Sequence, residues 1–288
     1  MNENKHLEDN MEYNTIICDR YGANDWIGRI TLNRPEKINA LSGELLAELE
    51  MALAKAAWDD DIRVIVIRGS GRGFGAGYDL SGSRGGDAPR QSRLTSSRQN
   101  MQEGSRRQMF LFNLPKVTIA QVHGYCLAGS CEYAMMTDLI VASEDARIGH
   151  PGIRGLGHPR NSCMWPMIIG LRKAKELMYT GDQLSGKEAA EIGMINKAVP
   201  ADQLEAEVTK LAERIANQSA DALAVHKEAM NRWYQAMGME SSIMAAADYD
   251  HVYQQTESAM EFKGKLRDEG LKGAFTWRDS RYQDLRGS

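Results

Sequence analysis

A carboxylate beside a turn of small residues is the first feature of this sequence that indicates chemistry. The stretch HGYCLAGSCEYAMMTD spans 123–138, and its turn at 127–130 leads into Cys131, Glu132 and an apolar helix. Free backbone N–H groups at a helix start attract negative charge. We therefore expect this turn to stabilise an anion, with Glu132 near enough to transfer a proton. The simpler alternative is that Glu132 only stabilises the dipole of its own helix.

A second turn of similar composition, GFGAGYDL at 73–80, supports the chemical interpretation. Each turn directly follows a predicted strand, and its small residues let a ligand approach the backbone closely. Neither turn matches the dinucleotide-binding fingerprint, and the sequence has no P-loop lysine. Two such turns after two strands therefore favour a pair of N–H donors aimed at one developing oxyanion.

Apolar patterns predict the elements that carry these turns. YNTIICDR at 13–20 and WIGRITLN at 26–33 are typical of paired strands, and IRVIVIR at 62–68 is typical of a buried one. Helical spacing over 42–58 predicts a helix capped by Ser42. Further elements are expected at 117–122 (strand), 130–136 (helix start) and 138–142 (strand).

The rest of the chain predicts helices outside one loop. The Gly-, Ser- and Arg-rich residues 81–98 favour a long mobile loop rather than a domain linker, because regular patterns resume on both sides. Helices are expected at 172–180, 185–192 (capped by Ser185), 202–216 and 221–237. We predict a disordered tail at 1–12, a mixed α/β core at 13–200 and a helical region at 201–288.

Composition limits the class of protein. The chain has 288 residues and a net charge of −4, which argues against a general nucleic-acid binder. No run approaches the roughly 20 apolar residues that cross a bilayer, and 1–12 lacks the apolar stretch of a signal peptide. The four cysteines fit neither a zinc site nor a disulfide framework. These features predict a cytoplasmic protein that binds neither membrane nor nucleic acid.

Arginines are concentrated in one part of the sequence. They lie between the first glycine-rich turn and the predicted strand at 117–122. A solvated surface segment is the simpler explanation, and a phosphate-bearing ligand nearby is the alternative. The arginines are Arg84, Arg90, Arg93, Arg98, Arg106 and Arg107.

Several stretches together resemble one enzyme superfamily. LNRPEKINALS at 32–42, GRGFGAGYDL at 71–80, the segment 122–153 and GDQLSGKEAAEIGMINKAVP at 181–200 are similar, in order, to the crotonase or enoyl-CoA hydratase/isomerase superfamily. The resemblance implies an α/β fold, a crotonase-like spiral of strand-strand-helix units with a C-terminal helical trimerisation region. It implies a homotrimer or a dimer of trimers. The implied substrate is an acyl-CoA thioester, with coenzyme A as part of the substrate, no permanently bound cofactor and no metal.

The resemblance also implies roles for individual residues. The thioester carbonyl would accept hydrogen bonds from the N–H groups of Tyr78 and Gly129, and Glu132 would be the main acid/base. The adenine end would lie near 37–40 and the loop after Asp79. The implied substrate contacts are Lys37, Ile38, Ala40, Ala76, Asp79, Leu80, Gly152, Arg160 and Trp165.

Two positions depart from the family pattern. Hydratases of this family place a second glutamate where this chain has Gly152, and some members place an aspartate where it has Arg160. His150 either compensates as an acid or base or points away to bond a neighbouring strand. Arg160 stays protonated, so it either binds an oxygen-rich acyl group or pairs with Glu132 and holds it ionised.

The reaction type therefore has alternatives. Family base rates favour hydration or dehydration of an enoyl-CoA with Glu132 as acid/base. The missing second glutamate favours double-bond isomerisation or hydrolytic C–C cleavage of a β-keto acyl-CoA. An alternative of another class is a non-catalytic acyl-CoA-binding protein.

Overall fold

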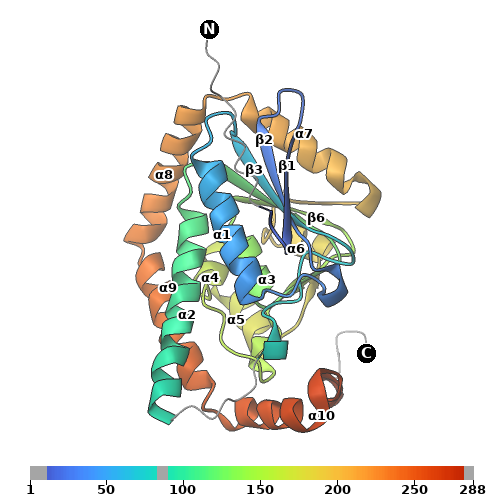
Figure 1. The fold of residues 1–288 in the computed structure, drawn as a ribbon, viewed down its shortest axis with the longest axis vertical. Helices are drawn as coiled ribbons and strands as arrows, with labels where there is room; N and C mark the ends of the chain where they lie inside the picture. Colours follow the sequence, from blue (N-terminus) through green and yellow to red (C-terminus); the bar gives the residue numbers. More distant parts are fainter. Residues whose placement is uncertain (1–11, 83–89, 282–288) are drawn as a thin grey trace.

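The computed structural model describes residues 12–82 and 90–281 and contains two sheets (Figure 1). The larger sheet has six strands in the order β1-β2-β3-β4-β6-β9, in which only the β1–β2 pair is antiparallel. These strands are Ile16–Tyr21, Ile27–Leu32, Val64–Gly69, Val117–Val122, Leu139–Ser143 and Lys197–Val199. The smaller sheet, β5-β7-β8, comprises Tyr125–Leu127, Arg147–Gly149 and Leu184–Ser185.

The central strand β3 shows why the large sheet is covered on both faces. Side chains alternate across a strand. Ile65 and Ile67 belong to the core that includes helix α1 (Gly43–Ala57), whereas Val64 and Val66 pack in a separate core with helix α7 (Leu204–Ala216). Figure 1 shows these two helices on opposite sides of the sheet. A continuous β-branched run is therefore what this strand requires.

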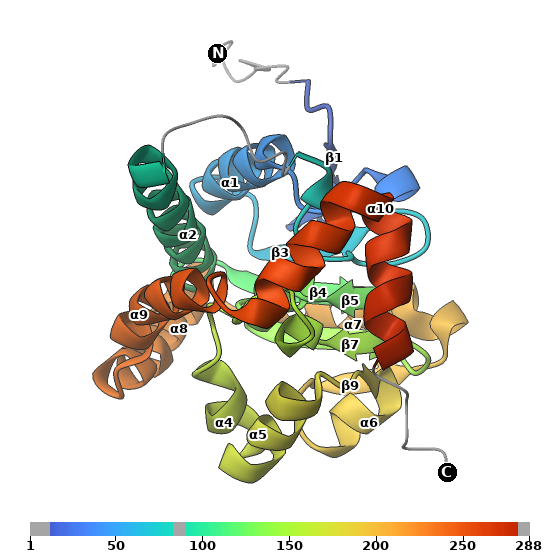
Figure 2. The ribbon, with the colours of Figure 1, turned by 90° about the horizontal axis from the view of Figure 1, so that it is seen from below.

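Among the remaining helices, α8 lies at the upper left of the molecule in Figure 1, α2 and α9 extend down its left side, and α10 lies along the bottom. The long helix α2 lies alongside α9, and α10 bends at Gly270, where φ is +69° (Figure 2). The helices are α2 Arg90–Phe112, α3 Gly129–Met135, α4 Met164–Ile169, α5 Leu171–Thr180, α6 Gly186–Glu191, α8 Ala220–Ala236, α9 Met239–Tyr253 and α10 Glu257–Arg281.

Most of the elements expected from the sequence are confirmed within a few residues. The Ser42 hydroxyl accepts a hydrogen bond from the N–H of Leu45, as an N-cap does. Ser185 and Glu188 form a complete capping box at α6. Within the described part of the chain, no helix is long and apolar enough to span a bilayer.

The loop expected at 81–98 is the main error. Residues 90–98 form the first part of α2, and 83–89 lie outside the described residues, as do 1–11 of the predicted tail. Helix α2 lacks an apolar stripe and is fixed by contacts with α9. The Ser105 hydroxyl donates to the carbonyl of Ile243 at 3.1 Å, and Arg98 pairs with Asp248 at 2.6 Å. Tertiary packing therefore overrides a weak local signal.

Candidate active site

The two glycine-rich turns lie side by side. The N–H of Gly75 donates to the carbonyl of Tyr125 at 2.7 Å, and the N–H of Leu127 donates back to the carbonyl of Gly75 at 3.0 Å. At Gly77 φ is +100°, and a Cβ there would lie 3.3 Å from the nitrogen of Gly129. The close approach and the positive φ both require glycine at this position.

The two predicted donors are free to meet a ligand. Within the described residues, the N–H groups of Tyr78 and Gly129 have no hydrogen-bond partner. Ala128, just before Gly129, has φ +48° and ψ −125°, a conformation that costs about 1–3 kcal/mol in a residue other than glycine. Because α3 has only seven residues, we attribute the positive potential here to the N–H groups rather than to a long helix dipole.

Asn39 and Ser130 hold the first turn in place. The buried Asn39 amide donates to the carbonyls of Ser70 and Gly73, each at 2.8 Å. The Ser130 hydroxyl, from the first turn of α3, accepts the N–H of Gly77 at 3.0 Å. These contacts fix the position of Tyr78 relative to Glu132, two residues after Ser130.

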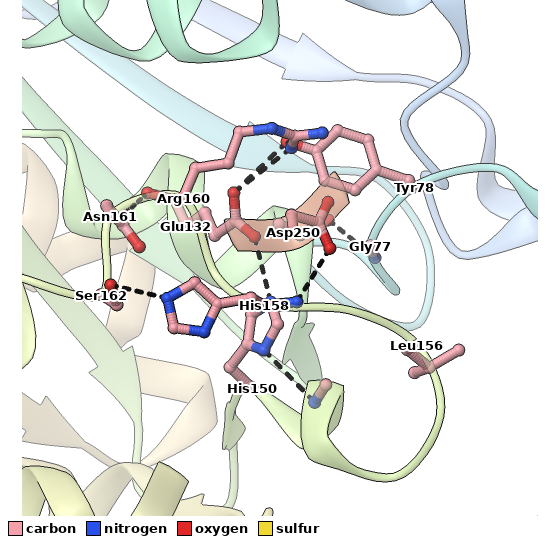
Figure 3. A network of polar contacts seen from close by, with 12 residues as sticks. Gly77, Tyr78, Glu132, His150, Leu156, His158, Arg160, Asn161, Ser162 and Asp250 are labelled. Carbon is pink, nitrogen blue, oxygen red and sulfur yellow. Dashed lines mark hydrogen bonds and ion pairs between the residues drawn. The ribbon is translucent and has the colours of Figure 1, made fainter. Parts of the chain in front are cut away.

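Four side chains from separate parts of the chain converge on the Glu132 carboxylate, which is 3% exposed. Figure 3 shows three of them, His150, Tyr78 and Arg160. One oxygen, Oε1, contacts His150 Nε2 at 3.0 Å. The other, Oε2, accepts from Gln108 Nε2 at 2.5 Å and from the Tyr78 hydroxyl at 3.4 Å. Arg160 Nη1 lies 3.6 Å from Oε2.

This environment keeps Glu132 ionised. Burial acts to raise the pKa of the carboxyl group, but the hydrogen bond from His150, the charge of Arg160 and the amide of Gln108 lower the pKa to about 2. The neighbouring anionic groups raise the pKa of Arg160 despite its own burial. Of the two alternatives for Arg160, the structure shows the ion pair with Glu132.

His150 points toward Glu132, not away to a strand. Its Nδ1 accepts the N–H of Gly152 at 3.2 Å, which places the ring proton on Nε2, where it is donated to Glu132. Both ring nitrogens are therefore used. In this arrangement His150 orients the carboxylate, and its predicted role as an acid or base stays a prediction.

Position 152 has no room for a side chain. A Cβ on Gly152 would lie 2.0 Å from the carbonyl oxygen of Gly157 and 2.5 Å from Cε1 of His150. The carbonyl of Gly152 also accepts bonds from the N–H groups of Leu156 and Gly157. The backbone path of this turn and the position of His150 therefore leave no space for a glutamate at position 152.

The predicted substrate contacts before residue 81 lie beside the first turn. The N–H of Ala76 donates to the carbonyl of Ile38 at 3.0 Å. Arg34 joins the carbonyl of Ala40 to the carboxylate of Asp79, the latter at 2.9 Å. Burial acts to raise the pKa of Asp79, but Ser81, Arg34 and Lys37 lower it. The ammonium of Lys37 lies 3.1 Å from the Ser81 hydroxyl, and Leu80 begins a 3₁₀ turn.

Other candidates lie farther from this arrangement. Trp165 is 2% exposed and packs in the main core. His158, which the sequence analysis did not single out, bonds Ser162 through its side chain and Asp250 through its backbone N–H (Figure 3). Among the clustered arginines, Arg98, Arg106 and Arg107 pair with carboxylates, Arg84 lies outside the described residues, and the side chains of Arg90 and Arg93 are not described.

Sequence reasoning missed Gln108 and Asn161. Gln108 is fully buried on α2 and bonds Glu132 directly, whereas the Asn161 amide donates to the backbone carbonyl of Glu132 at 2.9 Å. Neither position stands out in the sequence, because amides are common on helix surfaces and in loops. In the part of the chain that is described, no group of three or more His, Cys, Asp or Glu side chains is placed to hold a metal ion.

Comparisons with known proteins identify the family. Residues 22–278 match the model of the enoyl-CoA hydratase/isomerase family, so the chain belongs to that family and is one of its enzymes. It is 37% identical over 211 residues to a probable mitochondrial enoyl-CoA hydratase of Dictyostelium discoideum, covering 73% of each protein. It is 36% identical over 257 residues to the putative enoyl-CoA hydratase EchA13 of Mycobacterium tuberculosis, covering 81% of this chain and 77% of that one.

Solved structures agree with the crotonase-like α/β fold that the resemblance implied. An enoyl-CoA hydratase/isomerase from Xanthobacter autotrophicus Py2 superposes with a TM-score of 0.86 at 32% identity, covering 95% of this chain and 100% of that chain. An enoyl-CoA hydratase from Mycobacterium smegmatis gives a TM-score of 0.85 at 31% identity, with 93% and 94% coverage.

Proposed function

We propose that this protein is a hydratase-like enzyme that adds water to, or removes it from, an acyl-CoA by stabilising a thioester enolate. The observation that supports this most is the pair of N–H groups at Tyr78 and Gly129, which have no partner among the described residues and lie beside the ionised, buried Glu132. Coenzyme A enters as part of the substrate, with its adenine end near 37–40. No permanently bound cofactor is needed for this chemistry.

Each part of the site has a role in this reaction. The thioester carbonyl accepts hydrogen bonds from Tyr78 and Gly129, which stabilise the negative charge that develops on its oxygen. Removing one such donor in other enzymes costs about 10²–10³ in kcat. Glu132 accepts a proton from water as the water attacks the β-carbon. His150, Gln108 and Arg160 hold the carboxylate in place and ionised.

The lack of a second carboxylate at Gly152 supports a second candidate reaction. A single carboxylate is enough to move a proton along an acyl chain, as isomerisation requires. It is also enough to activate one water for hydrolytic C–C cleavage of a β-keto acyl-CoA. Both reactions use the same pair of N–H donors and the same enolate. They differ from hydration in the product that leaves the site.

Product analysis distinguishes these reactions. Purified protein is incubated with crotonyl-CoA, a 3-enoyl-CoA and a β-keto acyl-CoA, and the products are identified by mass and by the absorbance of the conjugated thioester. We expect 3-hydroxybutyryl-CoA from crotonyl-CoA, abolished in Glu132→Gln. Turnover of the 3-enoyl-CoA alone would assign the enzyme to isomerisation instead of hydration, and turnover of the β-keto acyl-CoA alone would assign it to C–C cleavage. Tight binding without turnover, unchanged in Glu132→Gln, would establish a non-catalytic acyl-CoA binder.

We also propose that the C-terminal helices assemble the chain into a trimer or a dimer of trimers in the cytoplasm. Large apolar side chains on these helices are exposed in the single chain: Val225, Met230, Trp233, Tyr249, Val252 and Met260. Exposed apolar surface of this kind is typical of interfaces. Sedimentation should give the mass of three or six chains, and a monomer at assay concentration would contradict the proposal.

A further inference from the structure

The proposed hydration needs two proton transfers, one from water and one to the α-carbon, and the described residues around Glu132 offer few groups for the second. Gly152 has no side chain, and His150 holds its one ring proton in a close 3.0 Å bond to Oε1 of Glu132 while its Nδ1 accepts the N–H of Gly152. The Arg160 guanidinium and the Gln108 amide do not exchange protons at working pH. One titratable hydroxyl remains near the carboxylate, that of Tyr78, 3.4 Å from Oε2 of Glu132.

We propose that the Tyr78 hydroxyl is the second proton-transfer group of this site and delivers the proton to the α-carbon. This inference rests on the proposed function. It gives Tyr78 two roles, because its backbone N–H is already one of the two oxyanion donors. The side-chain role is independent of the backbone role, so the two can be separated by substitution.

The position of the Tyr78 ring supports this role. A Cβ built on Gly129 would lie 2.4 Å from Cε2 of Tyr78, so the ring lies against Cα of Gly129, the residue that carries the second oxyanion donor. From there it extends to Glu132, where Figure 3 shows the hydroxyl beside the carboxylate and the Arg160 guanidinium. The α-carbon is bonded to the thioester carbonyl carbon, so a thioester held by both N–H groups places its α-carbon next to this ring.

The hydrogen-bond pattern sets the direction of the hydroxyl proton. The Tyr78 oxygen accepts from Arg160 Nη1 and, at 3.5 Å, from Gln108 Nε2. A phenol has one proton to donate, and here it is directed toward Oε2 of Glu132. Burial and the charge of Glu132 raise the pKa of Tyr78 against the opposing effect of Arg160, so the phenol is protonated before reaction.

The steps balance over one turnover. Water adds its oxygen to the β-carbon and gives a proton to Glu132, while the π electrons of the double bond move to form the enolate. The enolate α-carbon then takes the hydroxyl proton of Tyr78. The phenolate that results lies beside the Arg160 guanidinium, whose centre is 4.6 Å from the ring centroid. Finally the proton on Glu132 passes to the phenolate, and both residues return to their starting states.

The test replaces the hydroxyl and keeps the ring and backbone. Tyr78→Phe should lower kcat for crotonyl-CoA hydration by about 100-fold or more, the usual contribution of an acid–base group, with KM little changed. The matched control is Tyr133→Phe on α3, because the buried Tyr133 hydroxyl has no partner within the described residues. Tyr133→Phe should leave kcat unchanged.

A second variant separates proton transfer from structural support. Fluorotyrosine incorporated at position 78 keeps the hydroxyl and its contacts but makes the phenol more acidic. It should retain turnover, and kcat should change with the acidity of the phenol across a series of fluorotyrosines, which a purely structural hydroxyl would not cause. This variant also decides the matter if Tyr78→Phe fails to fold.

The outcomes distinguish this inference from the proposed function. An active wild type with an unaffected Tyr78→Phe would overturn the role of the hydroxyl and leave the hydratase assignment intact. A kcat that does not depend on the acidity of the phenol across the fluorotyrosine series would overturn it as well. A wild type that hydrates no enoyl-CoA would overturn both proposals. Loss of kcat in Tyr78→Phe, with a kcat that follows the acidity of the phenol across the fluorotyrosine series, would support both.

Discussion

Two buried glutamates, Glu48 on α1 and Glu132 on α3, are held by different kinds of partner. Glu48 accepts the backbone N–H groups of Asn14 and Thr15, each at 2.8 Å, and the Thr15 hydroxyl. Burial acts to raise its pKa, but these bonds lower it. Its partners come from one short segment at the start of β1, so the carboxylate ties that segment to the helix.

All four partners of Glu132 are side chains, whereas two of the three donors to Glu48 are backbone N–H groups. His150, Gln108, Tyr78 and Arg160 come from elements far apart in sequence. Two of them have spare capacity, because Gln108 Oε1 and Arg160 Nε are buried without a partner among the described groups. Side chains can change rotamer and partner during a reaction, whereas the backbone N–H groups of Asn14 and Thr15 cannot move without moving the chain that leads into β1. The kind of partner, more than burial itself, therefore distinguishes a structural carboxylate from a reactive one.

The largest expected effect comes from restoring the missing glutamate. Gly152→Glu should destabilise the protein by about 3 kcal/mol or more and should lower hydration, because the new Cβ overlaps the carbonyl oxygen of Gly157 and displaces His150 from Glu132. Urea unfolding and crotonyl-CoA turnover measure the two effects.

Gly264→Glu is the control for this substitution, since a Cβ at Gly264 in α10 meets nothing within 4 Å. It should leave stability and turnover nearly unchanged. A stable Gly152→Glu variant with faster hydration would show that the turn at 152 adapts, and the distinction drawn for Glu132 would lose one of its supports.

A smaller effect concerns pH. The pKa of Glu132 is lowered from its ordinary 4.5 to about 2, so the carboxylate should stay ionised down to strongly acidic pH. The ionisation of Glu132 should therefore not make the rate of hydration depend on pH above that range. By the same linkage, its contribution to stability is present above pH 4.5 and is lost as pH falls toward 2. Arg160→Met removes one cause of the lowering, so the acid limb of kcat/KM should move up by about 1–3 pH units.

The exposed ion pair of Arg98 with Asp248 provides the control. Arg98→Met should not move the limb, because surface pairs contribute little. An identical acid limb in wild type and Arg160→Met would mean that Arg160 does not set the ionisation of Glu132, and that its role is to bind substrate or to support Tyr78.

The elements of the site were predictable where local pattern and tertiary packing agree. The run at 62–68 is β-branched because β3 is buried on both faces, and the two glycine-rich turns meet because β3 and β4 are parallel neighbours. The sequence also showed that the second glutamate is absent. Why it is absent depends on the approach of Gly157 to Gly152, a contact that no local pattern specifies.

Other features were out of reach because they arise from packing between distant segments. Helix α2 has no apolar stripe that would indicate which of its faces is buried. There was therefore no sign in the sequence that Gln108 on this helix contacts Glu132. The direction of the Tyr78 side chain depends on Arg160, which is 82 residues away. The predicted division into a core and a C-terminal region at residue 200 stays a prediction.

The central claim is that Glu132 is reactive whereas Glu48 is structural, and one paired measurement tests it most directly. Glu132→Gln and Glu48→Gln each replace a carboxylate oxygen that accepts hydrogen bonds with an NH₂ group that cannot accept them. Each substitution should lower the free energy of unfolding by about 1–3 kcal/mol. Both variants are assayed for crotonyl-CoA hydration per mole of folded protein, with the folded fraction taken from unfolding curves. We predict that kcat falls by about 100-fold or more in Glu132→Gln and is unchanged in Glu48→Gln. Equal losses in the two variants, or none in either, would contradict the claim.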